Sequence, residues 1–250
     1  APDAPEALNL LHQNNIACFR TPESCAESVK TFLNTKNPVK PIILKNDLSD
    51  ISKKLEKNIF KNLSEDEALE IFKDIGIEIV DYKVSSNEKQ AIEYSSQIGF
   101  PIAMKVLSNQ ILHKTETGGV ELNIKNLDEL KTSFQKLSDV FQKLKMKSSD
   151  EKFLIQKMEK GIAEIILGYR VDELVGPIVV IGSGGILSEI YNDKSIRMAP
   201  VDITEAKKMI KEVKSLVTIT GYRGLPEVDI NIIANAIVNM SKFAFVKEIK

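Results

Sequence analysis

A lysine in the middle of an apolar stretch is the first residue whose type and position could do chemistry. Lys105 stands inside residues 102–107, an otherwise apolar run that predicts a buried strand. Burying an ammonium group costs free energy unless an anion partners it. Two interpretations follow. Lys105 binds an anionic ligand such as a phosphate, or one face of the strand is open to solvent and Lys105 points outward.

The loop after this strand carries a second group of reactive side chains. Residues 110–119 include His113, Lys114 and Thr115 and end on Gly118 and Gly119. Two glycines allow a ligand close to the backbone, and a lysine with hydroxyl groups suits a phosphate. The loop lacks the Gly-Lys-Ser/Thr of a Walker motif. His113 is a candidate catalyst, although a lone histidine is more often a polar surface residue.

Two further charged residues lie beside apolar runs. Glu164 falls within 162–168, which predicts a carboxylate buried in a strand and partnered by a metal, a ribose hydroxyl, an arginine or simply a nearby lysine. Arg197 could hold a phosphoryl group or form a salt bridge. Residues 182–185, Gly-Ser-Gly-Gly, fail as a dinucleotide-binding fingerprint, because Leu187 takes the third glycine's place and a strand is expected to follow. A tight connection between antiparallel strands is the better interpretation.

The elements that must position these residues follow from hydrophobic periodicity. In the first half we expect a helix from a capping box at 64–67 to Gly76, strands at 77–84, 102–107 and 120–124, and helices at 85–98 and 126–146. In the second half we expect strands at 153–158, 163–171, 177–181 and 186–191, then helices at 204–213 and 228–246. The second-half strands are too closely spaced for parallel crossovers, so they should pair antiparallel. The pattern predicts an α/β (α+β) protein of two lobes with a cleft between them.

Composition divides the chain into four parts. Residues 1–34 read as two short helices around a strand-like piece at 16–19, too little to bury a core alone, and resemble the end of a larger domain. Residues 35–62 are rich in lysine and proline and predict a linker. Residues 63–152 form the expected first lobe, and residues 153–250 the second.

Bulk properties exclude several classes of protein. The 250 residues carry 34 basic and 35 acidic side chains, a net charge of −1, which argues against nucleic acid as a partner. The sequence contains no apolar run of the roughly 18 residues that a membrane helix needs, and no secretory signal is visible. Cys18 and Cys25 therefore predict reduced thiols in a cytoplasmic protein. Without CxxC or HExxH, a protein-only zinc site is not expected.

Taken together, these segments resemble a known family. Residues 63–246 resemble the ATP-grasp domain of ADP-forming acyl-CoA synthetases, the acetate–CoA ligase relatives of succinyl-CoA synthetase. The matching segments, in the family's order, are 64–68, 99–105, 111–120, 155–158, 163–168, 176–186, 197–200 and 221–224. Residues 1–34 look like the C-terminal end of the family's flavodoxin-like CoA-ligase domain. The resemblance implies a two-lobed ATP-grasp fold preceded by that end.

The resemblance also implies a role for each matching residue. Lys105 would bind ATP phosphates, and Glu164 would face the ribose and phosphates. Gln156, Lys157 and Met158 would form a hinge strand that faces adenine mainly through backbone groups. The nucleotide-binding residues implied are Lys105, Lys114, Thr115, Gly118, Gly119, Gln156, Lys157, Met158, Glu164 and Arg197. His113 would be a phosphohistidine station that takes phosphate from the CoA half and passes it to ADP. Mg²⁺ would neutralise the phosphate charge.

The implied activity is that of the nucleotide-binding part of an enzyme that converts acid, CoA and ATP reversibly to acyl-CoA, ADP and phosphate. Its partners would be the CoA-binding and CoA-ligase domains, in a homo- or hetero-oligomer. The family's metal motif is expected just after Lys250, so the chain alone is not expected to make acyl-CoA. The alternative is a non-catalytic nucleotide or acyl-CoA sensor fused to an acyltransferase. Lys105 together with His113 favours the enzyme, while the acid, and ADP against GDP, stay open.

Overall fold

The computed structural model describes residues 4–34, 48–56, 62–108, 117–143, 151–185, 193–224 and 227–246. The chain forms two compact units, Ala1–Pro41 and Ile42–Lys250. The first unit contains α1 (Pro5–Gln13) and α2 (Pro22–Leu33), and neither helix has a buried residue. Thr21 caps α2, with its hydroxyl accepting a hydrogen bond from the Ser24 N–H at 3.2 Å. Residues 16–19, expected to be strand-like, form no strand, because no described segment pairs with them.

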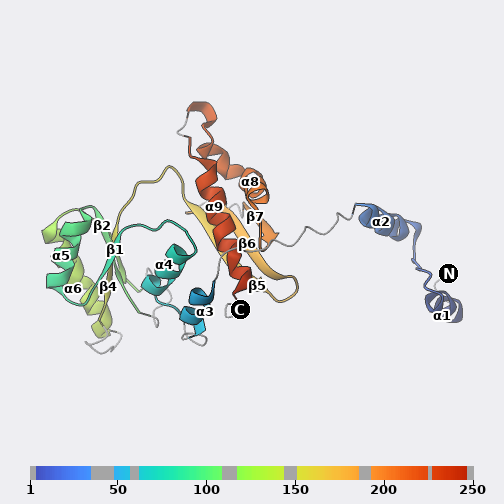
Figure 1. The fold of residues 1–250 in the computed structure, drawn as a ribbon, viewed down its shortest axis with the longest axis horizontal. Coiled ribbons are helices and arrows are strands. Elements are labelled where there is room, and N and C mark those ends of the chain that lie inside the picture. Colours follow the sequence, from blue (N-terminus) through green and yellow to red (C-terminus); the bar gives the residue numbers. More distant parts are fainter. Residues whose placement is uncertain are drawn as a thin grey trace. The chain divides into compact units, whose positions relative to one another are not determined.

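The second unit contains a four-stranded antiparallel sheet (Figure 1). Its strands are β1 (Tyr82–Ser85), β2 (Ile102–Val106), β3 (Val120–Ile124) and β4 (Phe153–Lys157), in the order β1-β4-β2-β3. β4 was predicted to open the second lobe, and that boundary is wrong, since β4 lies between β1 and β2 of the first sheet. A sequence pattern indicates that a strand exists but not which strand it pairs with.

Two helices supply the first sheet with its core. Helices α5 (Glu88–Ile98) and α6 (Leu127–Lys143) pack on it, and the cluster includes the fully buried Leu130, Leu137 and Phe141. The ring of Phe153 in β4 lies 5.4 Å from that of Phe141, edge to face, and 4.6 Å from that of Phe134. Aromatic contacts of this kind add to the free energy gained by removing apolar area from water.

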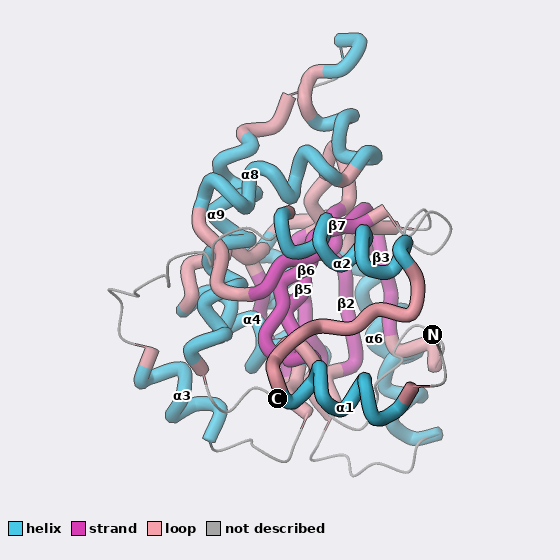
Figure 2. Tube along the Cα trace, turned by 90° about the vertical axis from the view of Figure 1, so that its right-hand side faces the viewer, coloured by secondary structure: helices cyan, strands magenta, loops and turns pink. Residues whose placement is uncertain are grey.

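A second antiparallel sheet follows. It consists of β5 (Ile165–Asp172), β6 (Gly176–Ser183) and β7 (Lys194–Met198), which lie side by side in that order (Figure 2). The antiparallel pairing predicted for the strands at 163–171 and 177–181 is confirmed by β5 and β6. The strand expected at 186–191 falls outside the described residues. The third described strand of the sheet, β7, was not predicted.

Helices cover one face of this second sheet, and Figure 1 shows α9 running along β5 and β6. They are α8 (Ile203–Glu212) and α9 (Ile230–Ser241), with short 3-10 turns η2 (Lys214–Ile219), η3 (Tyr222–Gly224) and η4 (Lys242–Phe245). The buried residues between helices and sheet include Val179, Ile181, Met209 and Ile237. We call this cluster the second core.

Two helices that precede the first sheet in sequence also belong to the second core. They are α3 (Ser49–Glu56) and α4 (Glu65–Asp74), which contribute Ile51 and Leu55, and Ile71. The linker predicted for 35–62 is therefore wrong for residues 49–56, where two apolar residues four positions apart make a buried stripe among lysines. Within the part of the chain that the structure describes, no helix is both long and apolar enough to cross a membrane.

Candidate functional site

Lys105 has a carboxylate partner. It is the only residue of β2 that is not buried, with Met104 and Val106 beside it fully inaccessible. Its Nζ donates to Oε1 of Glu65 at 2.5 Å, and the two side chains are 24% and 28% exposed. The structure gives Lys105 a partner that the sequence analysis did not predict. Lys105 does not simply point into solvent, because an anion of the protein itself sits on its ammonium group.

The sequence explains why Glu65 is there. The capping box at Ser64, predicted from residues 64–67, starts α4, and the Glu67 carboxylate accepts a hydrogen bond from the Ser64 N–H at 2.8 Å. This start puts Glu65 in the first helical turn, where the unpaired N–H groups favour negative charge. The ion pair with Lys105 therefore joins the beginning of α4 to the middle of β2.

The glycine pair predicted to line the phosphates is found in the turn that enters β3. Gly118 is exposed with a φ of +71°, a conformation that disfavours a side chain, and no atom of the described residues lies within 4 Å of the place where its Cβ would be. The Gly119 carbonyl accepts a hydrogen bond from the Val106 N–H at 2.9 Å, which holds this end of the loop against β2. His113, Lys114 and Thr115 lie outside the described residues.

The predicted hinge residues stand at the end of β4, and much of their hydrogen bonding is internal. The N–H of Lys157 donates to Asp81 and that of Met158 to Pro101, at 2.9 and 3.1 Å. The Lys157 ammonium donates to the Gly99 carbonyl at 3.0 Å, where it caps the C-terminus of α5. Gln156 is buried. Two backbone donors expected to recognise a base are thus already used, as is the Lys157 side chain.

Glu164 is not the buried strand residue that the sequence predicted. It precedes β5 and is exposed, because the ladder of β5 begins only at Ile165. Its carbonyl accepts a hydrogen bond from the Gly184 N–H at 2.7 Å. A Cβ at Gly184 would lie 2.8 Å from the Glu164 carbonyl carbon, and one at Gly185 would lie 2.7 Å from Oε2. The two glycines let the chain after β6 fold against Glu164.

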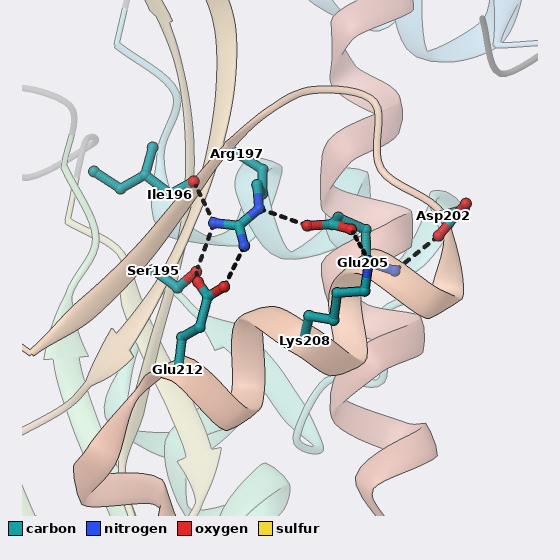
Figure 3. Close-up of polar contacts among 7 residues, drawn as sticks. All are labelled: Ser195, Ile196, Arg197, Asp202, Glu205, Lys208 and Glu212. Carbon is teal, nitrogen blue, oxygen red and sulfur yellow. Dashed lines mark hydrogen bonds and ion pairs between the residues drawn. The ribbon is translucent and has the colours of Figure 1, made fainter. Parts of the chain in front are cut away.

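Arg197 points toward the helices of the second core, where it is held by carboxylates (Figure 3). Its Nε donates to Oε1 of Glu205 at 2.7 Å, its Nη2 pairs with Glu212, and its Nη1 donates to Oγ of Ser195 at 3.3 Å. These contacts raise the pKa of Arg197 and lower the pKa values of Glu205 and Glu212. Of the two roles that the sequence left open, the geometry favours the salt bridge over a phosphate contact.

The other face of the second sheet is a candidate site that sequence reasoning missed. Side chains alternate across the pleat, so Ile166, Val180 and Ile196 lie on the face opposite to the second core. A pocket of about 350 Å³ opens there. It is lined by these three residues together with Arg170, Ile178, Gly182, Ser183, Asp193 and Lys194. The signal that could have found it is the period-two pattern of Ile166, Gly168 and Arg170.

The pocket combines an apolar floor with a polar rim. Glycines at 168 and 182 leave the floor hollow, and a Cβ at Gly168 would lie 3.1 Å from Val180. The Ser183 hydroxyl is buried without a hydrogen-bond partner among the described residues. The N–H groups of Ser215 and Lys214 lower the pKa of Asp193, while Arg170 pairs with Asp172 at 2.9 Å. Such a surface suits a planar, largely apolar ring with hydrogen-bonding groups at its edge.

The two sheets and their sites define an ATP-grasp protein, and the comparison with known families agrees. Residues 54–249 match the family model described as an ATP-grasp domain. This chain belongs to that family, and within it to the group of ADP-forming acetate–CoA ligases. The β subunit of acetate–CoA ligase [ADP-forming] I of Pyrococcus furiosus is 38% identical to it over 182 residues, 73% of this chain and 78% of that subunit.

Longer relatives and solved structures extend the likeness. Acetate–CoA ligase [ADP-forming] I of Archaeoglobus fulgidus is 32% identical over 95% of this chain, which spans only 39% of that relative. Relatives thus include both a separate subunit and a longer chain. A structure of the Ca. Korarchaeum cryptofilum acetyl-coenzyme A synthetase 1 with coenzyme A and Ca-AMPCP has a TM-score of 0.71 at 30% identity. It covers 80% of this chain and 87% of the solved one.

A second structure of the Korarchaeum protein contains coenzyme A and Mg-AMPPCP, with its phosphohistidine segment pointing towards the nucleotide binding site. Its TM-score is 0.65 at 30% identity, over 80% of this chain and 86% of the solved one.

Proposed function

We propose that this chain is the nucleotide-binding part of an ADP-forming acyl-CoA synthetase. The observation that carries the proposal is the match along 95% of the chain to a longer acetate–CoA ligase [ADP-forming]. The enzyme would convert a carboxylic acid, CoA and ATP reversibly to acyl-CoA, ADP and phosphate. Acid selectivity would reside in the CoA part, so the residues of this chain do not define the acid.

The nucleotide would use both sheets. We infer that the base lies on the open face of the second sheet, against Ile166 and Ile196, since an aromatic ring gains free energy by covering apolar area. The phosphates would extend toward Lys105 and the predicted loop residues Lys114, Thr115, Gly118 and Gly119. Gln156, Lys157 and Met158 would border the base, and Glu164 the ribose side.

His113 would carry the phosphoryl group between the two halves of the enzyme. A neutral imidazole nitrogen attacks the phosphorus, an N–P bond forms, and the bond to the leaving oxygen breaks. When ATP is the donor, the leaving group is ADP. In the reverse direction a β-phosphate oxygen of ADP attacks and the imidazole leaves. Lys105 would stabilise the negative charge on the phosphate oxygens during both steps.

Magnesium would come with the nucleotide. The described residues contain no cluster of three histidines, cysteines or acidic residues that could hold a metal by themselves. Mg²⁺ in such enzymes is commonly held by substrate phosphates, waters and one or two carboxylates. Among the described residues, the exposed carboxylate of Glu164 could be such a carboxylate ligand of Mg²⁺. When bound, the metal would neutralise phosphate charge.

We further propose that the N-terminal unit completes a CoA-ligase domain that precedes it in a longer enzyme. Its helices bury no residue, and Phe32 and Leu33 are 78% and 75% exposed. So small a unit cannot make a core alone. The partners would be the CoA-binding and CoA-ligase domains, and the acid and CoA would be bound through them. The cytoplasm, where thiols such as Cys18 and Cys25 stay reduced, is the proposed location.

The test uses the fact that the chain has two histidines, His12 and His113. Wild type, His113→Ala and the control His12→Ala would be incubated with ATP labelled in the γ-phosphate and Mg²⁺, then assayed for acid-labile, base-stable label. We expect label on wild type and His12→Ala and none on His113→Ala. Equal labelling of His113→Ala would overturn the relay. Nucleotide binding without label on the wild type would favour the sensor.

A further inference from the structure

The ion pair between Glu65 and Lys105 connects parts of the chain with different packing. Lys105 belongs to β2 of the first sheet, whereas Glu65 belongs to α4, whose Ile71 is buried in the second core. The Phe72 ring of α4 also lies 6.4 Å from that of Phe243 in this core. A carboxylate fixed to the second core therefore holds the ammonium group of the first sheet.

A second polar contact fixes the same helix to the same sheet. Tyr82 in β1 donates its hydroxyl hydrogen to Oε1 of Glu70 at 2.6 Å, and burial together with this bond raises the pKa of Tyr82. Glu65 and Glu70 thus hold α4 at two points along the sheet. Only the contact of Glu65 involves a residue proposed to bind the nucleotide.

A lysine that must meet a phosphate benefits from such a partner. The four-carbon stem of lysine has many rotamers, and fixing it in one of them costs free energy. An unpaired lysine would bear this cost when the ligand binds, and the cost would weaken the binding. An ammonium group has three N–H donors, so one bond to Glu65 leaves donors for a phosphate oxygen. With both side chains about one quarter exposed, the attraction is screened less than on an open surface.

We propose that Glu65 is a positioning residue for Lys105, which preorganises the ammonium group for the nucleotide phosphates and ties its position to the second core. The proposal rests on the proposed nucleotide site. Glu65 touches no phosphate itself and acts through Lys105. A carboxylate that merely competed with the phosphates for the same ammonium would have the opposite effect on affinity.

The experiment is a double-mutant cycle on Mg-ADP affinity, measured by titration calorimetry with the 250-residue chain. The variants are Glu65→Gln, Lys105→Met and the double substitution, with Glu70→Gln as the matched control on the same helix. We expect about a 10-fold loss of affinity for Glu65→Gln and about a 30-fold loss for Lys105→Met. The double variant should match Lys105→Met within twofold, because Glu65 acts only through the lysine. Glu70→Gln should keep the affinity of the wild type.

Each outcome bears on one statement. Tighter binding or unchanged affinity in Glu65→Gln, with a wild type that binds, overturns the positioning role and leaves the proposed function intact. The positioning role is also overturned if the affinity loss of the double variant equals the product of the losses of the two single variants. If the wild type binds no nucleotide, the proposed function fails first. Melting temperatures of all variants would identify a misfolded protein, and Glu65→Asp, which keeps the charge, then replaces Glu65→Gln.

Discussion

The two sheets solve the problem of binding a charged ligand in different ways. In the first sheet the central strands are buried on both faces, and Lys105 is the one residue of β2 that is not buried. In the second sheet one face packs on helices, and the other carries an open pocket over Ile166, Val180 and Ile196. The first sheet presents one ammonium group, that of Lys105, among buried residues, and the second sheet presents an apolar surface. Substitutions in the first sheet should therefore mainly lower the stability of the fold, whereas substitutions on the open face of the second sheet should mainly lower the affinity for the ligand.

The largest effect should come from the buried face of the first sheet. Ile155 in β4 is completely inaccessible, so Ile155→Ala leaves a cavity and should lower the free energy of unfolding by about 3 kcal/mol. Urea denaturation followed by circular dichroism measures this. A loss below about 1 kcal/mol would show that the central strand is less tightly packed than the comparison requires.

The open face of the second sheet should behave in the opposite way. Ile196 is 43% exposed, so Ile196→Ala should change the unfolding free energy by less than about 1 kcal/mol. It removes part of the proposed floor for the base, and Mg-ADP affinity should fall about fivefold. Calorimetric titration measures the affinity. Unchanged affinity in a folded variant would remove this face from the nucleotide site.

The smallest effect should appear at the packed face of the second sheet and should depend on pH. Arg197 lowers the pKa values of Glu205 and Glu212 in the folded state, so their pairs stabilise the fold above about pH 4.5 and lose this effect as pH falls through the lowered pKa values. The carboxylates are 33% and 48% exposed, so the gain at pH 7 is about 1 kcal/mol. Arg197→Met should lose that amount at pH 7, and less at pH 3.

Nucleotide binding sharpens this last test. If Arg197 only joins β7 to α8, Arg197→Met should keep its affinity for Mg-ADP, measured at pH 7 on the folded variant. A loss of affinity of more than about fivefold would favour the other interpretation from the sequence, in which Arg197 contacts a phosphate.

Local signals in the sequence were sufficient for the elements but not for their neighbours. The capping box at 64–67 and the strand around Lys105 could be predicted, because a helix start and an apolar run depend on adjacent residues. The partner of Lys105 could not be predicted, because Glu65 belongs to α4 and the local sequence of a helix does not indicate which strand it packs against. β4 was predicted as a strand but with the wrong sheet for the same reason.

The second core shows the same limit. The helix that buries Ile51 and Leu55 was not predicted, because lysines dominate the composition of this segment and only two of its residues form the buried stripe. Glu164 was predicted as buried because its neighbours are apolar, but its carboxylate lies outside the ladder that begins one residue later.

The insertion of β4 between β1 and β2 has a consequence for how the chain is made. Tyr82 pairs with Gln156, which leaves the ribosome much later, whereas β2 and β3 are near neighbours in sequence. During synthesis the pairing of β2 with β3 can form early, while β1 must wait for β4. Proteolytic removal of residues after 143 would accordingly leave β1 with no partner strand and β2 with an unpaired edge, the kind of surface on which incomplete chains aggregate.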